Sequence, residues 1–426
     1  MKICVQGLGY IGLPTAAMLA LGGHEVVGFD VDPRVLAALR EGAHHVKEES
    51  VRAIVLDALA SGKLTLSEAL PADAKAYIIC VPTPTIDRRP DLSYVEAASL
   101  EVGPLLQPGD LVILESTVPP GTMERVVVPA LRSAGVDPDT VAIAHCPERV
   151  IPGAIVKELR ENDRVVGGRK PGDAEQAREL YAAFCQGAIH TTDNITAELS
   201  KVVENTYRDV NIAFANELAL LAEELGVDVH EVIALANRHP RVDILAPGPG
   251  VGGHCIPVDP HFLSNANPFV TELIQTSRRI NERMPHVVVR RIIEFVPRER
   301  AKIAILGAAY KANVDDTRES PTERVEELLH ERGYQTQVFD PIADRYVHAL
   351  SPSLEDAVRG SDAIVLMVGH APFASIDPSA VAPLCRAKIV VDTRAFLDAK
   401  RWTSAGFRFY TLGGKRQPLP SVAEAV

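Results

Sequence analysis

The 426-residue sequence lacks three features that would assign it to a common class of protein. It has six cysteines but no CxxC pair, so we expect neither a disulfide framework nor a metal site. Basic residues do not outnumber acidic ones, and the net charge of −12 argues against a nucleic-acid or anionic-membrane partner. No apolar run is long enough to span a bilayer, and no signal peptide precedes the first strand-like segment. We therefore expect a cytoplasmic protein, with Cys4 and Cys80 as small core residues.

The N-terminal segment has the order of elements that a dinucleotide site requires. KICVQGLGYIGLPTAAMLA reads as an apolar strand, a glycine-rich turn and the start of a helix, and EVVGFDVD is the next strand. Gly7, Gly9 and Gly12 would let the backbone approach a pyrophosphate at the helix N-terminus. Asp30 would accept the ribose hydroxyls, which favours NAD over NADP. A tight turn without a ligand is the alternative.

Three later segments, AYIICVPTP, DLVILEST and VAIAHCPE, are nearly continuous in apolar residues. Such runs are typical of parallel strands that are covered on both faces. Ligands of open α/β sheets bind at the carboxyl ends of the strands. Thr83, Thr117 and Glu148 are therefore candidates for the pocket, although each is equally compatible with an ordinary turn or cap.

The C-terminal part repeats the beginning of the chain. KIAILGAAY resembles KICVQGLGY, TQVFDP resembles VVGFDVDP, and DAIVLMVGH resembles AYIICVPTP. The repeat predicts an α/β protein with two Rossmann-like doubly wound parallel sheets joined by a long central helix. The second sheet lacks the full glycine fingerprint, so it either binds a nucleotide differently or serves as a scaffold.

A continuous helix is predicted at about residues 194–225, and Gly226 ends it. Lys201, Asn205 and Arg208 share one face of this helix, which is either exposed to solvent or part of a site. At 1.5 Å per residue the helix is about 45 Å long, which suits a spine between two domains and a surface for a homodimer. Its apolar residues form one stripe on the opposite face, made of Leu199, Val203, Tyr207, Val210, Phe214, Leu218, Leu221 and Leu225.

The segment GVGGHCIPVDP, residues 250–260, surrounds one thiol with glycines, prolines and an aspartate. Oxidation of an alcohol by a nicotinamide needs no thiol, so a reactive cysteine indicates a second oxidation step. A cysteine adduct of an aldehyde, the thiohemiacetal, donates a hydride readily and leaves a thioester that water cleaves. Cys255 would then need a lowered pKa, which Lys201 and backbone N–H groups can provide, and Asp259 is a candidate base. An inert buried cysteine, with Asp259 as a cap, is the alternative.

Seven motifs, in order and spread over most of the chain, resemble those of the UDP-sugar 6-dehydrogenase family. They are GLGYIGLP, VPTP, ILESTVPPGT, CPERVIPG, ELSKVVENTYRDVNIAFANEL, GPGVGGHCIPVDP and GAAYKANVDDTRESP. The resemblance implies an NAD-binding domain, a central helical dimerisation domain and a C-terminal UDP-binding domain, which we place at residues 1–192, 193–297 and 298–426. It also implies that the C6 alcohol of a UDP-sugar is oxidised to a carboxylate with two NAD.

The resemblance further assigns roles to individual residues. Cys255 would be the nucleophile, Lys201 the acid/base or oxyanion partner, and Asn205 a second donor to the oxyanion. Proton transfer and thioester hydrolysis are implied for Thr117, Asp259 and Glu148. Cofactor contacts are implied for Gly7, Gly9, Tyr10, Ile11, Gly12, Asp30, Thr83, Thr117 and Arg318. Contacts with the nucleotide sugar, or contacts that close its pocket, are implied for Arg149, Val150, Lys201, Asn205, Arg208, His239, Arg241, Gly252 and Lys311.

One motif departs from the UDP-glucose dehydrogenases of the family, which typically have PEFLxEG where this chain has PERVIPG. Arg149 follows the glutamate, and Pro152 stands in place of a second glutamate, which disfavours glucose. PERVIPG and ANRHPRVDILAPGPG resemble the UDP-N-acetyl-D-mannosamine dehydrogenases, so we expect oxidation of that sugar to its uronate. Oxidation of UDP-N-acetyl-glucosamine or UDP-glucose is an alternative. Two further alternatives are a one-step oxidoreductase and a non-catalytic regulator that binds NAD or a nucleotide sugar.

Overall fold

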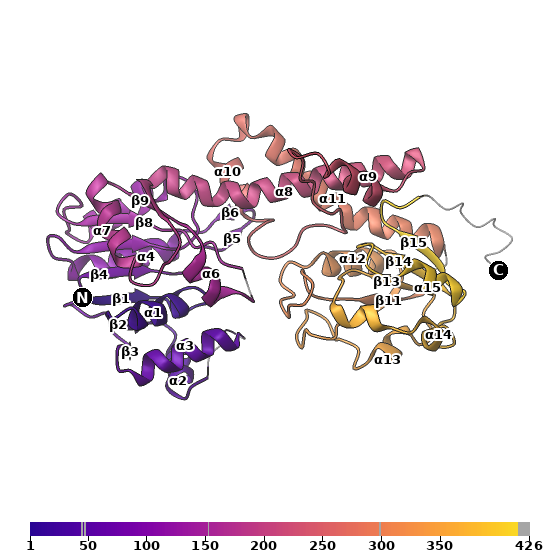
Figure 1. The fold of residues 1–426 in the computed structure, drawn as a ribbon, viewed down its shortest axis with the longest axis horizontal. Coiled ribbons are helices and arrows are strands. Elements are labelled where there is room, and N and C mark those ends of the chain that lie inside the picture. The colour runs from indigo at the N-terminus through magenta and orange to yellow at the C-terminus, as the bar shows by residue number, and fades with distance from the viewer. Residues whose placement is uncertain (44–45, 47, 152, 298–299, 416–426) are drawn as a thin grey trace. The chain divides into compact units, whose positions relative to one another are not determined.

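The structure is a computed structural model that describes residues 1–43, 46, 48–151, 153–297 and 300–415 (Figure 1). The chain divides into two compact units. Unit 1 comprises residues 1–204 and 261–267, and unit 2 comprises residues 205–260 and the chain from residue 268 onward. Among the described helices, none has both the length and the apolar character needed to cross a membrane.

Unit 1 is built on an eight-stranded sheet with the order β10-β9-β8-β7-β4-β1-β2-β3. Neighbouring strands are parallel, except for the antiparallel pair of β8 and β9. The strands are β1 (Lys2–Gln6), β2 (Glu25–Phe29), β3 (Leu64–Ser67), β4 (Ala76–Ile79), β7 (Leu111–Leu114), β8 (Ala142–His145), β9 (Arg164–Gly168) and β10 (Ile189–Asp193). A short hairpin, β5 (Thr85–Ile86) and β6 (Arg89–Pro90), lies outside this sheet. The three apolar segments predicted as parallel strands are confirmed as β4, β7 and β8.

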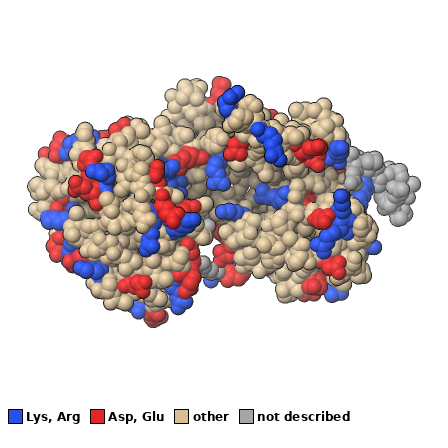
Figure 2. Space-filling view, in the orientation of Figure 1, with Lys and Arg blue, Asp and Glu red and all other residues tan. Residues whose placement is uncertain are grey.

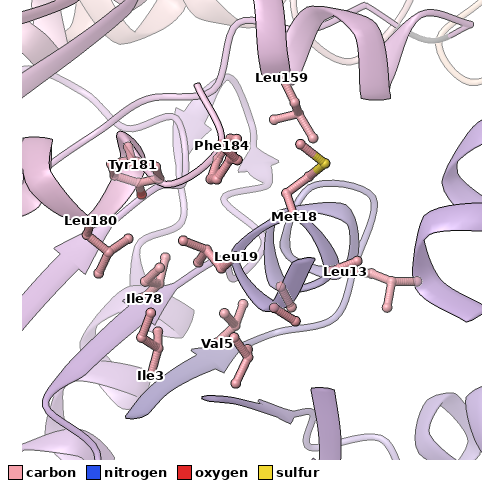
Figure 3. Close-up of a cluster of buried hydrophobic side chains, with 14 of the residues drawn as sticks. Ile3, Val5, Leu13, Met18, Leu19, Ile78, Leu159, Leu180, Tyr181 and Phe184 are labelled. Carbon is pink, nitrogen blue, oxygen red and sulfur yellow. The ribbon is translucent and has the colours of Figure 1, made fainter. Parts of the chain in front are cut away.

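Helices cover both faces of this sheet because successive side chains of a strand point to opposite sides. Ile3 and Val5 of β1 belong to one buried cluster, whereas Cys4 between them belongs to another, as predicted for a small core residue. Figure 3 shows the first cluster, in which Ile3, Val5 and Ile78 pack beneath the helix that carries Leu13, Met18 and Leu19. The helices of unit 1 are α1 (Gly12–Leu21), α2 (Pro33–Arg40), α3 (Glu49–Ala60), α4 (Ser93–Val102), α5 (Val128–Ser133), α6 (Ile155–Glu161) and α7 (Pro171–Tyr181), with the 3-10 helix η1 (Gly103–Leu105) and the π-helix η2 (Met123–Val127).

The long helix α8 (Asn194–Leu225) begins in unit 1 and ends in unit 2, with the bounds that the sequence predicts. Gly226, at φ +71°, follows its last residue. Six of the eight residues in the predicted apolar stripe are exposed, among them Phe214 and Leu221 at 50% each. The buried side is lined instead by small and polar residues, including Ala213, Asn216 and Ala219. Packing within the chain therefore leaves the apolar stripe uncovered.

Unit 2 contains a five-stranded parallel sheet with the order β12-β11-β13-β14-β15. Its strands are β11 (Lys302–Leu306), β12 (Gln335–Phe339), β13 (Ala363–Leu366), β14 (Ile389–Asp392) and β15 (Arg408–Thr411). One face packs against α11 (Glu272–Phe295) and α12 (Pro321–His330), and the other against α13 (Leu354–Val358), α14 (Pro378–Val381) and α15 (Ala399–Ser404). The remaining described helices are α9 (Val229–Ala236), the 3-10 helices η3 (Pro268–Val270) and η4 (Ala371–Ser375), and α10 (Asp259–Ala266), which begins in unit 2 and continues in unit 1.

The internal repeat is confirmed by matching backbone geometry in the two sheets. Gly7 follows β1 at φ +92°, and Gly307 follows β11 at φ +98°. Asp30, after β2, accepts a hydrogen bond from Leu8 N, and Asp340, after β12, accepts one from Ala308 N. The predicted fold class, two Rossmann-like sheets joined by a long helix, is correct.

Candidate functional site

The glycine-rich turn of unit 1 is packed tightly at two positions and open at the third. A Cβ atom on Gly7 would lie 2.5 Å from the carbonyl oxygen of Cys80, and one on Gly12 would lie 1.9 Å from that of Gly7. A Cβ on Gly9 would have no atom within 4 Å. The turn is therefore held close to β4 on one side and leaves space beside Gly9 for a ligand to approach the backbone. This arrangement fits a dinucleotide pyrophosphate.

Asp30 lies at the end of β2 and is half-buried. One carboxylate oxygen accepts from Leu8 N at 2.8 Å and the other from Asp32 N at 2.9 Å. Each carboxylate oxygen has a second lone pair, so the group can still accept ribose hydroxyls. Tyr10, exposed at 36%, and half-buried Ile11 lie in the same turn.

Polar residues at the carboxyl ends of β4 and β7 are tied together. The hydroxyl of Thr83 donates to the carbonyl oxygen of Thr117 at 2.8 Å, and Ser116 donates to that of Val81 at 2.6 Å. The structure thus brings together two predicted cofactor contacts. Cys80, predicted to be a small core residue, packs against the apolar core of unit 1, and its thiol also donates to Oε2 of the buried Glu115 at 3.0 Å.

Glu148 follows β8 and is only 9% exposed. Its carboxylate accepts from Arg149 N at 2.5 Å and lies 3.3 Å from Nη2 of Arg164, the first residue of β9. Arg149, predicted to contact substrate, forms a bidentate ion pair with Glu204, in which Nη2 lies 2.6 Å from Oε1 and Nε lies 3.2 Å from Oε2. Val150 is half-buried, and Pro152 lies outside the described residues.

The N-terminal half of α8 anchors the loop that carries Thr117. The buried carboxylate of Glu198 accepts from the backbone N–H of Gly121 and from that of Met123, the latter at 2.8 Å. Burial raises the pKa of Glu198 to about 7, although the N–H groups of Met123 and Gly121 and the charge of Arg125 oppose that rise. Lys201, one turn further along the helix, is half-buried.

In unit 2 the loop before Cys255 is packed against the loop that follows β11. A Cβ on Gly252 would lie 2.5 Å from the carbonyl oxygen of Glu319, and one on Gly253 would lie 2.9 Å from the ring of Tyr310. The loop is also tied to α8, since Gly248 N donates to Asn216 at 2.8 Å. Only glycine allows such close contact, which explains the unusual composition of this segment.

Cys255 is half-buried and lies one helical turn before α10. Its carbonyl oxygen accepts from Val258 N at 3.0 Å and from Asp259 N at 2.9 Å. The side chain of Asp259, 3% exposed, accepts from Nδ2 of Asn205 at 2.6 Å. Asn205 is 8% exposed, so the interpretation of its helix face as solvent-exposed is wrong at this position. Its amide has a second N–H with which to meet a ligand.

The loop after β11 carries two of the predicted binding residues, Lys311 and Arg318, and both are exposed. Arg318 is paired with Asp316 at 2.6 Å, and this hydrogen bond raises the arginine pKa. In the same loop, Asn313 N donates to Nδ1 of the buried His370, which therefore donates through Nε2 to Asp340 at 3.0 Å. This histidine fixes the loop. Asp340 is thereby fully engaged by protein groups, unlike Asp30.

The remaining predicted substrate residues, Arg208, His239 and Arg241, are all exposed in unit 2. Unit 1 thus holds the glycine turn, Asp30, Thr83, Thr117, Glu148 and Lys201, and unit 2 holds Asn205, Cys255 and Asp259. Sequence reasoning missed Glu115, Arg164 and Tyr310. The signal that identifies Glu115 and Arg164 is a charged residue at the edge of an apolar strand. Glu115 directly follows the strand in LVILE, and Arg164 begins the strand in RVVGG. Among the described residues, no three His, Cys, Asp or Glu side chains are placed to hold a metal ion.

The chain is similar to known proteins along most of its length. Residues 1–185, 195–283 and 304–399 match the NAD-binding, central and UDP-binding domains of the UDP-glucose/GDP-mannose dehydrogenase family. A UDP-N-acetyl-D-mannosamine dehydrogenase of Methanocaldococcus jannaschii is 44% identical over 419 residues, which are 97% of this chain and 96% of that protein. An NDP-N-acetyl-D-galactosaminuronic acid dehydrogenase of Ralstonia nicotianae is 43% identical over 416 residues, 94% of this chain and 97% of that protein. The solved structure of the UDP-D-ManNAc dehydrogenase of Pyrococcus horikoshii superposes with a TM-score of 0.91 at 41% identity, covering 97% of this chain and 99% of that one.

Proposed function

The chain belongs to the UDP-glucose/GDP-mannose dehydrogenase family, and we propose that it oxidises the C6 alcohol of UDP-N-acetyl-D-mannosamine to the carboxylate, using NAD twice. The observation that carries the reaction type is the half-buried thiol of Cys255, which lies beside the buried pair of Asn205 and Asp259. The choice of sugar is supported by relatives of that name at 41–44% identity and by the PERV motif.

Residues of unit 1 fit the cofactor. Gly7, Gly9 and Gly12 would hold the pyrophosphate, Asp30 the ribose, and Thr83 and Thr117 line the carboxyl ends of the neighbouring strands. When bound there, NAD would supply the hydride acceptor for both oxidations.

We assign the remaining chemistry to side chains of the protein. The ammonium of Lys201 and the second amide N–H of Asn205 stabilise negative charge on the C6 oxygen. Cys255 attacks the aldehyde carbon, and the new C–S bond gives a thiohemiacetal that is oxidised to a thioester. Water then adds to the thioester, the C–S bond breaks, and the thiolate is released together with the carboxylate product. Thr117, Asp259 and a water take the proton that leaves the alcohol, and Glu148 takes a proton from the water that cleaves the thioester.

We infer a cytoplasmic homodimer with the domain bounds 1–192, 193–297 and 298–426. The dimer is supported by the exposed stripe of α8, where Tyr207 is 59% and Leu225 68% exposed. A contiguous apolar surface on a helix is typical of a protein interface. Cytoplasmic residence is supported by the two substrates, since NAD and nucleotide sugars are made and used there.

The test is a comparison of kcat/KM for NADH formation with four UDP-sugars, those of N-acetyl-mannosamine, N-acetyl-glucosamine, N-acetyl-galactosamine and glucose. The galactosamine sugar is included because of the relative from Ralstonia nicotianae. We expect the mannosamine sugar to be preferred by at least tenfold, about 1.4 kcal/mol of transition-state binding. Comparable turnover of UDP-glucose would contradict the assignment of the sugar, and no turnover of any UDP-sugar would contradict the enzyme.

A further inference from the structure

A single buried guanidinium is shared by two carboxylates in unit 1. The side chain of Arg164 is 5% exposed, and its Nη2 lies 3.3 Å from Oε2 of Glu148. Its Nη1 lies 3.5 Å from Oε1 of Glu115, whose side chain is fully buried. Glu148 follows β8 and Glu115 follows β7, so both acids lie at the carboxyl ends of adjacent parallel strands. This is the edge of the sheet at which ligands bind.

The orientation of Arg164 is fixed by groups other than these two acids. Its guanidinium carbon lies 4.8 Å from the ring centre of Tyr181 and 5.1 Å from that of Phe184. Nη1 also lies 3.7 Å from the sulfur of Cys146. Figure 3 shows Tyr181 and Phe184 within the main apolar cluster, which is rigidly packed. Arg164 is therefore a fixed cation to which Glu148 is held, and a planar guanidinium stacked in this way is not interchangeable with an ammonium.

The second acid, Glu115, is buried in a way that favours its protonated, neutral form. Burial raises its pKa to about 7, although the charge of Arg164 opposes that rise. The groups facing it from the surrounding elements are Arg164, Glu148, Cys80, Cys146, Tyr181 and Thr15. When Glu115 carries its proton, the positive charge of Arg164 is balanced by Glu148 alone. In that state the guanidinium of Arg164 and the carboxylate of Glu148 form a buried ion pair of one cation and one anion.

We propose that Arg164 is a positioning residue for Glu148, fixing the direction and the negative charge of the carboxylate that takes a proton from the thioester-cleaving water. The inference rests on the proposed function, which supplies the thioester. In the step concerned, the water oxygen bonds to the thioester carbon, one water proton passes to Glu148, and the C–S bond breaks to release the Cys255 thiolate. Without Arg164 the carboxylate would be buried with no cation, so it would either turn away or take up a proton.

The experiment follows the covalent adduct of Cys255 through time. Wild type, Arg164→Met, Arg164→Lys, Glu148→Gln and the double variant R164M/E148Q are mixed with excess NAD and the UDP-sugar that wild type turns over fastest. The reaction is quenched at intervals, and intact-mass spectrometry gives the fraction of protein that carries the sugar adduct. NADH absorbance gives the rate of the first oxidation in the same mixtures.

We expect the adduct to decay on the order of 10²-fold more slowly in Arg164→Met and Glu148→Gln than in wild type, because a misplaced base no longer reaches the water. The first NADH should form within about threefold of the wild-type rate. In the Glu148→Gln background, Arg164→Met should change adduct decay by less than about twofold, because both residues act through one carboxylate. Arg169→Met is the matched control, since Arg169 pairs with Asp139 and Glu124 instead, and it should change neither rate.

Two results would overturn the inference. One is a folded Arg164→Met protein whose adduct decays at the wild-type rate. The other is an equal loss from Arg164→Met in both backgrounds, which would assign Arg164 to folding alone. If Arg164→Met does not fold, Arg164→Lys and the double variant E115Q/R164M take its place. The double variant also removes the Glu115 carboxylate, which Arg164→Met would leave buried without a cation. The rate of adduct decay in these variants, with and without Glu148→Gln, then decides in the same way. Failure of the proposed function is distinguishable, because wild type itself would then form either no NADH or NADH without any covalent adduct on Cys255.

Discussion

Replacing Gly9 by alanine separates cofactor binding from folding more cleanly than any other change in the glycine turn. A methyl group at Gly9 would have no atom within 4 Å, and the backbone there is not left-handed, so we expect no loss of stability. The methyl would instead fill the space through which a pyrophosphate approaches the backbone. We expect the Kd for NAD to rise at least tenfold, about 1.4 kcal/mol.

Gly12→Ala should behave differently because its methyl group would meet the protein itself. The new Cβ would lie 1.9 Å from the backbone oxygen of Gly7 and 2.9 Å from Cβ of Cys80. Overpacking of this kind costs about 1–3 kcal/mol, and Tm falls by about 2–4 °C for each kcal/mol in a unit of this size. Gly12→Ala should therefore lose both thermal stability and NAD affinity.

The assay is calorimetric titration with NAD, together with a thermal melt of each variant. Gly172→Ala in α7 is the matched control, because its methyl also meets nothing within 4 Å, and it should lower neither the thermal stability nor the affinity for NAD. A Gly9→Ala protein that binds NAD with wild-type affinity would refute the placement of the dinucleotide at this turn.

Three further predictions follow from other parts of the chain. Cys255→Ser should bind NAD normally but form neither the covalent adduct nor the carboxylate. The control Cys385→Ser should form the adduct and the carboxylate as wild type does. Formation of the carboxylate by Cys255→Ser would rule out the thioester. The pKa of Glu198, raised from 4.5 to about 7, means that the folded chain keeps a proton which the unfolded chain loses as pH rises, so this group's contribution to stability falls between pH 4.5 and 7. Between pH 5 and pH 8, the free energy of unfolding measured with urea should fall by about 2.5 kcal/mol less in Glu198→Gln than in wild type, and equal falls would contradict the assignment. Phe214→Glu should convert a dimer into a monomer in light scattering, whereas Tyr94→Glu, at an equally exposed site of 50%, should not; an unchanged dimer would exclude the α8 stripe as the interface.

Local features of the fold could be predicted from the sequence. Continuous apolar runs give β1, β4, β7 and β8, and the glycines after β1 fix the turn, because each depends on a few neighbouring residues. The bounds of α8 follow from an unbroken period of three to four residues that Gly226 ends. The internal repeat predicts the second sheet for the same reason.

The environment of the candidate residues could not be predicted, because it depends on contacts between distant segments. Asn205 is buried since Asp259, 54 positions away, accepts its hydrogen bond. The helical period identifies an apolar stripe on α8 but does not say which face the chain covers, and the structure covers a face of small and polar residues instead. Arg164 and Glu115 are 49 positions apart and become a pair only when β7, β8 and β9 assemble.

The central claim is that one active site carries a sugar from alcohol to acid through the thiol of Cys255. Its most direct test is a titration in which limiting UDP-N-acetyl-D-mannosamine is consumed to completion with excess NAD. The account predicts two NADH for each sugar and a carboxylate as the only sugar product. One NADH for each sugar, with an aldehyde product, would contradict it.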